Sequence, residues 1–184
     1  MCARDDRVAA TVAELGAVPY AVNIVSDEFA RHELRLRAAG FTAMMSANVE
    51  LHKFFPDGNT RLVEEGFTCL TRSEHWALAD EGCRGIARVA FRPAEPTTWG
   101  DPVLVHTLNV ESQGRLDAAG APAAVLRHLR RIHQRALTDI SMRPSCVAAL
   151  TALLNLSSHK ECQVSICKAG LMLLLRIHLS LIHI

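Results

Sequence analysis

Apolar positions along the chain keep a fixed distance from a recurring glycine. Four glycines, spaced by about 50 residues, each follow an aliphatic residue by four positions, and such self-similarity is typical of repeat proteins. The pairs are Val12 and Gly16, Leu62 and Gly66, Leu116 and Gly120, and Ile166 and Gly170. Glycine accepts the left-handed conformation that ends a helix, and Pro19 and Pro122 follow two of these glycines where the next helix would begin. The pattern therefore predicts a sharp corner between two helices at each glycine.

Two further columns keep the same period. Seven positions before the glycine stand Ala9, Asn59, Gln113 and Gln163, of which three are carboxamides. Five positions after it stand Ala21, Thr71, Val125 and Leu175. Because these columns agree with the glycine pattern, we expect a short first helix before each glycine and two further helices after it.

Two apolar segments predict the last helix of a unit. Residues 146–156 form an Ala-rich run that begins after Pro144 and ends in Leu-Asn-Leu, with Asn155 next to last. Residues 103–110 have a similar end, in which Asn109 is next to last. The preceding residues, 92–102, contain three prolines and a glycine and predict a loop.

These elements predict an all-α fold in a single repeat array over residues 1–184. The expected units cover about 4–56, 57–110 and 111–158, with a partial unit at 159–175. Aromatic residues make up only 5% of the chain, whereas Ala, Leu, Arg and Val are abundant. Such a composition suits packed helices better than a β-sandwich.

The clearest copy resembles the armadillo repeat family. Its residues 152–157 are Ala-Leu-Leu-Asn-Leu-Ser, similar to the A-L-x-N-L end of an armadillo third helix. Residues 161–170 are similar to the N-Q-x-x-I-x-x-A-G first helix, except that Cys162 replaces Asn. The resemblance is strong over 146–175, clear over 103–126 and weak over 8–25 and 59–72. It implies an armadillo-like α-α superhelix, a right-handed solenoid of three-helix repeats that is incomplete at the C-terminus. Since the glycine spacing exceeds the usual unit length, HEAT-like packing of the weaker copies stays open.

The resemblance also implies a binding site for peptides. In armadillo proteins the third helices line a concave groove, and an Asn near the end of each hydrogen-bonds the backbone of an extended peptide; this role transfers to Asn109 and Asn155. Val105 and Thr151 stand one turn earlier and would line the same groove. Nuclear-import adaptors carry a Trp at that position, so its absence disfavours an import-adaptor role. For both Asn residues the alternative is structural, with the amide capping neighbouring backbone.

The formal net charge is +1, so no global field favours nucleic acid or an anionic membrane. One predicted second helix is locally basic. Its arginines are Arg127, Arg130, Arg131 and Arg135. They are candidates for contact with an acidic partner or a nucleic-acid backbone, and a solvated outer face is the alternative. His128 and His133 lie five positions apart, on different faces of that helix, so we expect no metal site there.

Other residue patterns argue against catalysis. The sequence has no G-x-S-x-G, no H-E-x-x-H and no Gly-rich phosphate loop, so we expect no enzyme activity, no cofactor and no small-molecule substrate. Six cysteines without a C-x-x-C pair, behind an N-terminus without an apolar run, indicate a cytoplasmic or nuclear protein. Cys162 and Cys167 are expected to be buried, inert thiols. Trp76 is expected to pack between units, and Trp99 to cover an apolar patch or anchor a contact.

The C-terminal residues 171–184 are apolar, but they are too few to span a bilayer, for which a helix needs about 20. The partial last unit lacks a third helix and a polar cap, which indicates truncation. The last six residues, Leu-Ser-Leu-Ile-His-Ile, resemble the translation of a sequencing adapter, so residues 176–184 form a doubtful tail.

Together these features predict a non-catalytic protein–protein interaction scaffold that binds an extended peptide segment in a concave groove. One alternative is an RNA- or acidic-surface-binding α-solenoid that uses the basic helix, which would show a steep salt dependence. Another is a non-catalytic regulatory part of a larger enzyme or ligase. Among partners, other proteins are expected, nucleic acid is disfavoured, and no membrane is expected.

Overall fold

The computed structural model describes residues 3–58, 60–91 and 102–182. The α-helices are α1 (Ala3–Glu14), α2 (Ala17–Ser26), α3 (His32–Ala47), α4 (Arg61–Thr71), α5 (Trp76–Ala90), α6 (Pro102–Ala118), α7 (Ala121–Thr138), α8 (Arg143–Leu156) and α9 (Lys160–Ile182). Short 3-10 helices are η1 (Val49–Phe54), η2 (Pro56–Gly58) and η3 (Ile140–Met142). The predicted all-α fold is therefore confirmed over the described ranges, which contain no strand.

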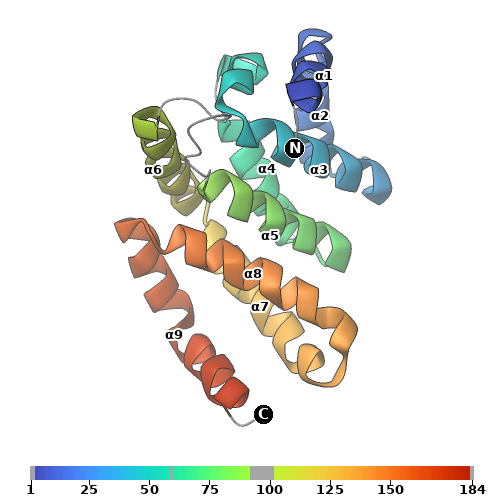
Figure 1. Ribbon diagram of the computed structural model, residues 1–184. Coiled ribbons are helices and arrows are strands. Elements are labelled where there is room, and N and C mark those ends of the chain that lie inside the picture. The colour runs from blue at the N-terminus through green and yellow to red at the C-terminus, as the bar shows by residue number, and fades with distance from the viewer. Residues whose placement is uncertain (1–2, 59, 92–101, 183–184) are drawn as a thin grey trace.

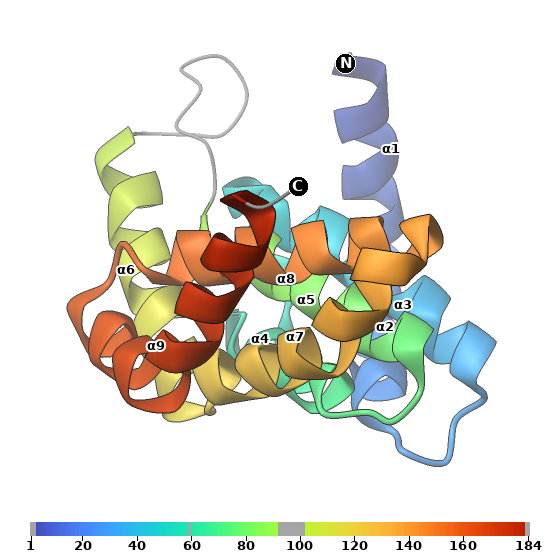
Figure 2. The ribbon, with the colours of Figure 1, turned by 90° about the horizontal axis from the view of Figure 1, so that it is seen from below.

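Six of the α-helices pack in two rows of three. One row consists of α3, α5 and α8, which lie side by side (Figure 1), and the other consists of α2, α4 and α7. Figure 2 shows the second row alongside the first, with α9 against α7. The order α1–α2–α3 recurs as α6–α7–α8, whereas η1 and η2 precede α4 where the other groups have a first helix. Helices of both rows bury apolar side chains against one another, which is how helical layers form a core.

One expected unit boundary is wrong. The boundary between residues 110 and 111 falls inside α6, because this helix continues past Asn109 to Ala118. No helix-ending signal follows Asn109 directly, and Gly114 is tolerated inside the helix. By contrast, the expected boundary after residue 158 agrees with the gap between α8 and α9. The last helix of the second group is therefore α5, and α6 begins the third group.

The recurring glycines divide into two kinds. Gly16 and Gly120 adopt the left-handed conformation, with φ of 80° and 79°, and each separates two helices as predicted. The corners expected at Gly66 and Gly170 are wrong, because both residues lie inside continuous helices, α4 and α9. Close packing explains glycine there: a Cβ on Gly66 would lie 2.9 Å from Val25 Cγ1, and one on Gly170 would overlap the side chain of Leu126. Only the two true corners are followed by a nearby proline.

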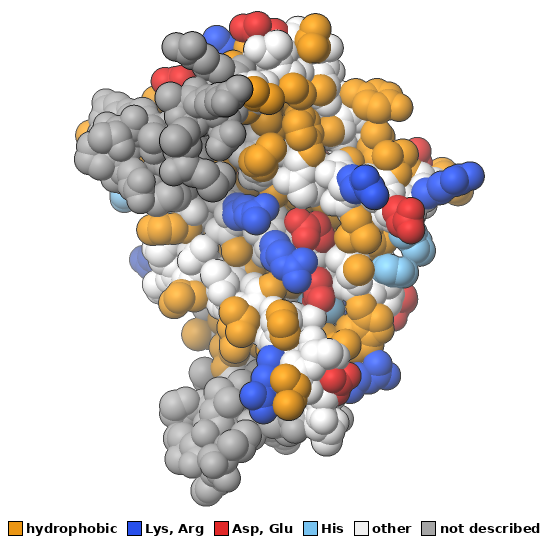
Figure 3. Space-filling view, turned by 45° about the vertical axis from the view of Figure 1, so that its right-hand side comes forward, with side chains coloured by type: hydrophobic (Ala, Val, Ile, Leu, Met, Phe, Trp, Pro, Cys, Tyr) orange, Lys and Arg blue, Asp and Glu red, His pale blue; other side chains and the backbone are white. Residues whose placement is uncertain are grey.

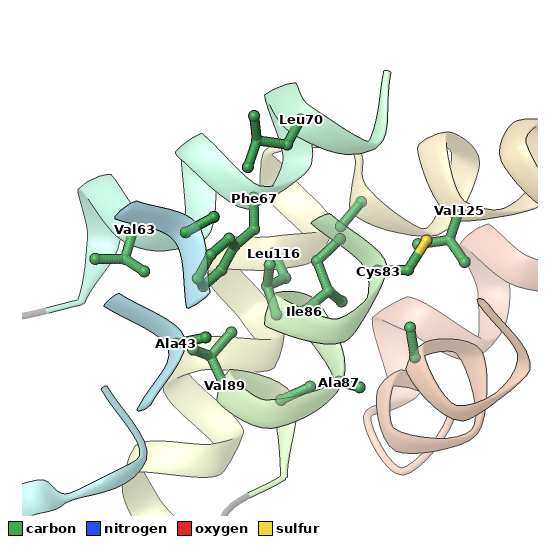
Figure 4. Close-up of a cluster of buried hydrophobic side chains, with 14 of the residues drawn as sticks. Ala43, Val63, Phe67, Leu70, Cys83, Ile86, Ala87, Val89, Leu116 and Val125 are labelled. Carbon is green, nitrogen blue, oxygen red and sulfur yellow. The ribbon is translucent and has the colours of Figure 1, made fainter. Parts of the chain in front are cut away.

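A continuous apolar core joins the helix groups (Figure 4). Phe67 and Leu70 of α4, Ile86 of α5 and Leu116 of α6 have no exposed surface. Burial of each such side chain contributes about 1.5–3 kcal/mol. One hydrophobic cluster therefore runs through helices from neighbouring groups.

Candidate protein-binding surface

The outward sides of α3, α5 and α8 form one continuous candidate surface. Side chains spaced by three or four residues stand on each helix, opposite its buried stripe. We call this the α3/α5/α8 surface, and it consists of Glu33, Arg37 and Met44 on α3, Glu81, Arg84 and Arg88 on α5, and Val147, Thr151 and Leu154 on α8. A Cβ on Gly40 of α3 would lie 3.7 Å from Glu81 Oε1, so the rows of α3 and α5 adjoin.

Apolar and basic groups are combined on this surface. Leu154 is 70% exposed, Val147 62% and Met44 56%, which leaves large apolar area in water. Figure 3 shows hydrophobic side chains above and below a middle band in which Lys and Arg side chains lie next to Asp and Glu side chains. Arg84 Nη1 lies 3.0 Å from Glu81 Oε2, whereas Arg88 forms no ion pair among the described residues. Exposed apolar groups beside an unpaired guanidinium are suited to a partner with complementary chemistry.

Asn155 lies at the edge of this surface and binds the neighbouring helix. Its Nδ2 donates to the carbonyl oxygen of Ala87 on α5 at 2.8 Å. Gln113 of α6 completes the junction, because its Nε2 donates to the carbonyls of Ala90 at 2.7 Å and Asn155 at 3.1 Å and to Ser158 Oγ at 2.7 Å. In the described contacts, the Asn155 amide therefore bonds to the backbone of a neighbouring helix, which is the structural alternative given for this residue.

The four expected peptide-binding residues do not share one helix row. Val105 and Asn109 lie on α6, which is a first helix rather than a third, and Val105 is 1% exposed. Their expected place at the end of a third helix is wrong, because α6 does not end at Asn109. Thr151 and Asn155 lie on α8 as expected. Thr151 is exposed, although its Oγ1 donates to Val147 O at 2.8 Å.

The arginines of α7 separate into two pairs. Arg131 and Arg135 lie over the ring of Trp76, with Cζ 5.5 Å and 4.8 Å from its centroid, and Arg131 also donates to the carbonyl of Ser73 at 3.0 Å. Arg127 and Arg130 are exposed. Trp76 of α5 thus packs against α7, between groups, as predicted, while Trp99 lies outside the described residues.

A buried polar cluster joins α5, α7 and α8, and the sequence patterns did not indicate it. His128 Nε2 lies 2.7 Å from Asp80 Oδ1, and Ser145 Oγ donates to Asp80 Oδ2. Burial alone would raise the pKa of Asp80, but the hydrogen bonds from His128 and Ser145 outweigh it and hold the pKa below its usual value of 3.8. His128 occupies an apolar position of α7, between the buried Val125 and Leu129, and that placement was the available signal.

The thiols differ in exposure. Cys162 is buried, its Sγ lies 3.4 Å from the carbonyl of Gln113, and burial raises its pKa to about 12. Cys167 is exposed, so the expectation that it is buried is wrong. It follows Ile166, which packs into the core, and the turn of about 100° per residue directs Cys167 to an exposed position. Within the described ranges no group of three or more His, Cys, Asp or Glu side chains could hold a metal ion.

Comparisons with protein-family models, with curated proteins and with solved structures give no match. Within the described residues no single helix is long and apolar enough to cross a membrane; only Val8–Glu14 together with Ala17–Ser26, bent by 78°, reach that length and composition. Function is therefore inferred from the chemistry of the surface itself.

Proposed function

We propose that this chain is a non-catalytic interaction scaffold of the armadillo type, which binds an extended segment of a partner protein along the α3/α5/α8 surface. The observation that carries the proposal is the row of exposed apolar and basic side chains across three adjacent helices. Five free cysteines among the described residues support a reducing compartment, the cytoplasm or the nucleus.

The chemistry of the surface indicates what the segment carries. Arg37, Arg84 and Arg88 outnumber Glu33 and Glu81, so the middle of the surface has a net positive charge. An acidic side chain on the segment would pair with Arg88, since guanidinium and carboxylate form charge-assisted hydrogen bonds. Apolar side chains on either side of it would cover Met44 and Leu154 of the surface. A central desolvated contact with a charged anchor is how interfaces gain both affinity and specificity.

The basic helix α7 is not proposed as a second site. Two of its four arginines, Arg131 and the exposed Arg135, already lie over the ring of Trp76, which leaves Arg127 and Arg130 as the exposed pair without a ring contact among the described residues. A nucleic-acid surface would need more free phosphate contacts than this pair provides.

The test is selection from a library of random linear peptides, followed by affinity measurement with the selected peptides. We expect acidic and apolar side chains in the selected sequences. The double change Arg84→Glu and Arg88→Glu should weaken binding by about tenfold or more, because it reverses two charges at the contact. Leu154→Asp should weaken it as well. Circular dichroism must show unchanged helicity in each variant.

Arg127→Glu with Arg130→Glu is the matched control, because it reverses two exposed charges on another helix. Peptides that bind this control and the Arg84/Arg88 variant equally well would refute the proposal, as would a library that yields no binder. Asn155→Ala is not a clean test, because it also removes the hydrogen bond to Ala87.

A further inference from the structure

A cavity of about 450 Å³ lies outside the α3/α5/α8 surface, between α4 and the end of α6. It is lined by Arg61, Glu65, Thr68, Arg72, Arg115, Ala118 and Ala119. Its volume falls in the range of about 300–1,000 Å³ that is common for small-ligand sites. Three guanidinium groups face it from two helices and one helix end, whereas Glu65 is the only carboxylate in the lining.

Arg115 is held rigidly at one wall of the cavity. Its Nε lies 2.6 Å from Glu64 Oε2 and its Nη2 3.0 Å from Glu64 Oε1, a bidentate pair. Glu64 is fully buried, and Thr60 Oγ1 donates to it at 2.8 Å. The hydrogen bond to Glu64 raises the pKa of Arg115 above its usual value, so the guanidinium stays charged. Two partly buried bonds fix its orientation before any ligand arrives.

The third nitrogen of Arg115 is only loosely engaged. Its Nη1 lies 3.6 Å from Oε2 of Glu111, which is longer than a hydrogen bond, and the Glu111 side chain is 53% exposed. An anion in the cavity can therefore replace Glu111 as the partner of Nη1. Since Glu111 is solvated, releasing it requires little free energy.

Arg72 borders the same cavity from the end of α4. Its Nη2 donates to the carbonyl of Ala119 at 2.6 Å, so the guanidinium covers the carbonyl end of α6 that would otherwise repel an anion. Arg61 pairs with Glu65 at 2.9 Å on the exposed rim. Three guanidinium groups are balanced by Glu64, Glu65 and Glu111, so the site gains one net positive charge when Glu111 swings out into water.

We propose that this cavity binds a phosphate monoester, with the phosphate between Arg72 and Arg115 and the organic part in the remaining volume. Arginine forms bidentate hydrogen bonds with phosphate oxygens, and a rigid, charged Arg115 requires no reorganisation on binding. Glu111 acts as the competing anion when the site is empty of ligand. This site is independent of the peptide surface, because the two share no residue.

The experiment is isothermal titration of the full chain at constant ionic strength with two phosphate monoesters as probes, glycerol 3-phosphate and a phosphoserine pentapeptide. The probe that binds more tightly identifies the source, a phosphorylated small molecule or a phosphorylated protein. Arg72→Gln should weaken binding by about tenfold or more, since it removes a charge-assisted contact. Glu111→Gln should strengthen binding, because it removes the competing carboxylate.

Arg61→Gln is a second variant in case Arg72→Gln does not fold, since Arg61 is solvent-exposed and its replacement spares the bond to Ala119. It should weaken binding by a smaller factor. Arg127→Gln on α7 is the matched control and should leave affinity unchanged. Failure of both probes to bind would overturn the proposal, and so would equal affinity in the wild type, Arg72→Gln and Glu111→Gln.

Discussion

Gly82 of α5 is the position where the packing of α4 against α5 can be tested most directly. A Cβ at Gly82 would lie 2.6 Å from the backbone nitrogen of Thr71 and 2.7 Å from the carbonyl oxygen of Phe67, and it would overlap Thr71 Oγ1. Rotation of a side chain cannot relieve contacts with backbone atoms. Gly82→Ala should therefore force the two helices apart.

The magnitude follows from two opposing effects. Replacing a helical glycine by alanine favours the helix by about 1 kcal/mol. Overpacking opposes this by about 1–3 kcal/mol, and the upper end applies because the backbone of Thr71 lies about 0.8 Å inside ordinary contact distance. We expect a net destabilisation of about 2 kcal/mol, which would lower Tm by about 4–8 °C for a chain of this size.

Gly114→Ala is the matched control, because Gly114 also lies inside a helix but its Cβ would meet only His159, at 3.9 Å. That change should stabilise the protein by up to about 1 kcal/mol. Urea unfolding followed by circular dichroism measures both, with the m-value checking that the unfolding reaction is the same. If Gly82→Ala raised the urea midpoint as Gly114→Ala is expected to do, the tight α4–α5 contact would be refuted.

Two further predictions concern buried polar groups and thiols. Hydrogen bonds hold the pKa of Asp80 below 3.8 in the folded state, so its ionised form stabilises the fold and this stabilisation is lost as the pH falls through the folded-state pKa. Urea midpoints between about pH 6 and pH 3 should therefore decline more steeply for the wild type than for Asp80→Asn. Parallel curves would contradict this. A thiol reagent near neutral pH should label Cys167 in the native protein and Cys162 only after unfolding, because burial raises the pKa of Cys162 to about 12. Mass spectrometry of the labelled peptides measures this. Rapid labelling of Cys162 in the native protein would contradict its burial.

Local chain signals predicted the helix corners well where two signals coincided. Gly16 and Gly120, each followed by a proline, close one helix and begin the next. Gly66 and Gly170 have the same spacing but no proline, and there the absence of a side chain serves close helix packing instead. Spacing alone does not distinguish these two uses of glycine, because both require a missing Cβ.

The candidate sites depend on contacts between residues far apart in the chain. Asp80 meets His128 and Ser145 only because α5, α7 and α8 pack together. Arg115 and Glu64 are 51 positions apart and belong to helices of different groups. No local periodicity encodes such pairs, so the sequence predicted the helices that carry them but not the pairs themselves.

Gln113 has a consequence for how the array unfolds. Its single amide donates to Ala90 at the end of α5 and to Asn155 near the end of α8, two carbonyls that helix termini leave without intrahelical partners. One side chain therefore ties the endings of two successive groups to the start of α6–α7–α8. In stacked helical repeats, contacts between neighbouring groups contribute to stability in addition to each group's own stability. Loss of the Gln113 amide would therefore leave a carbonyl at the end of α5 and another near the end of α8 without this partner at the same time.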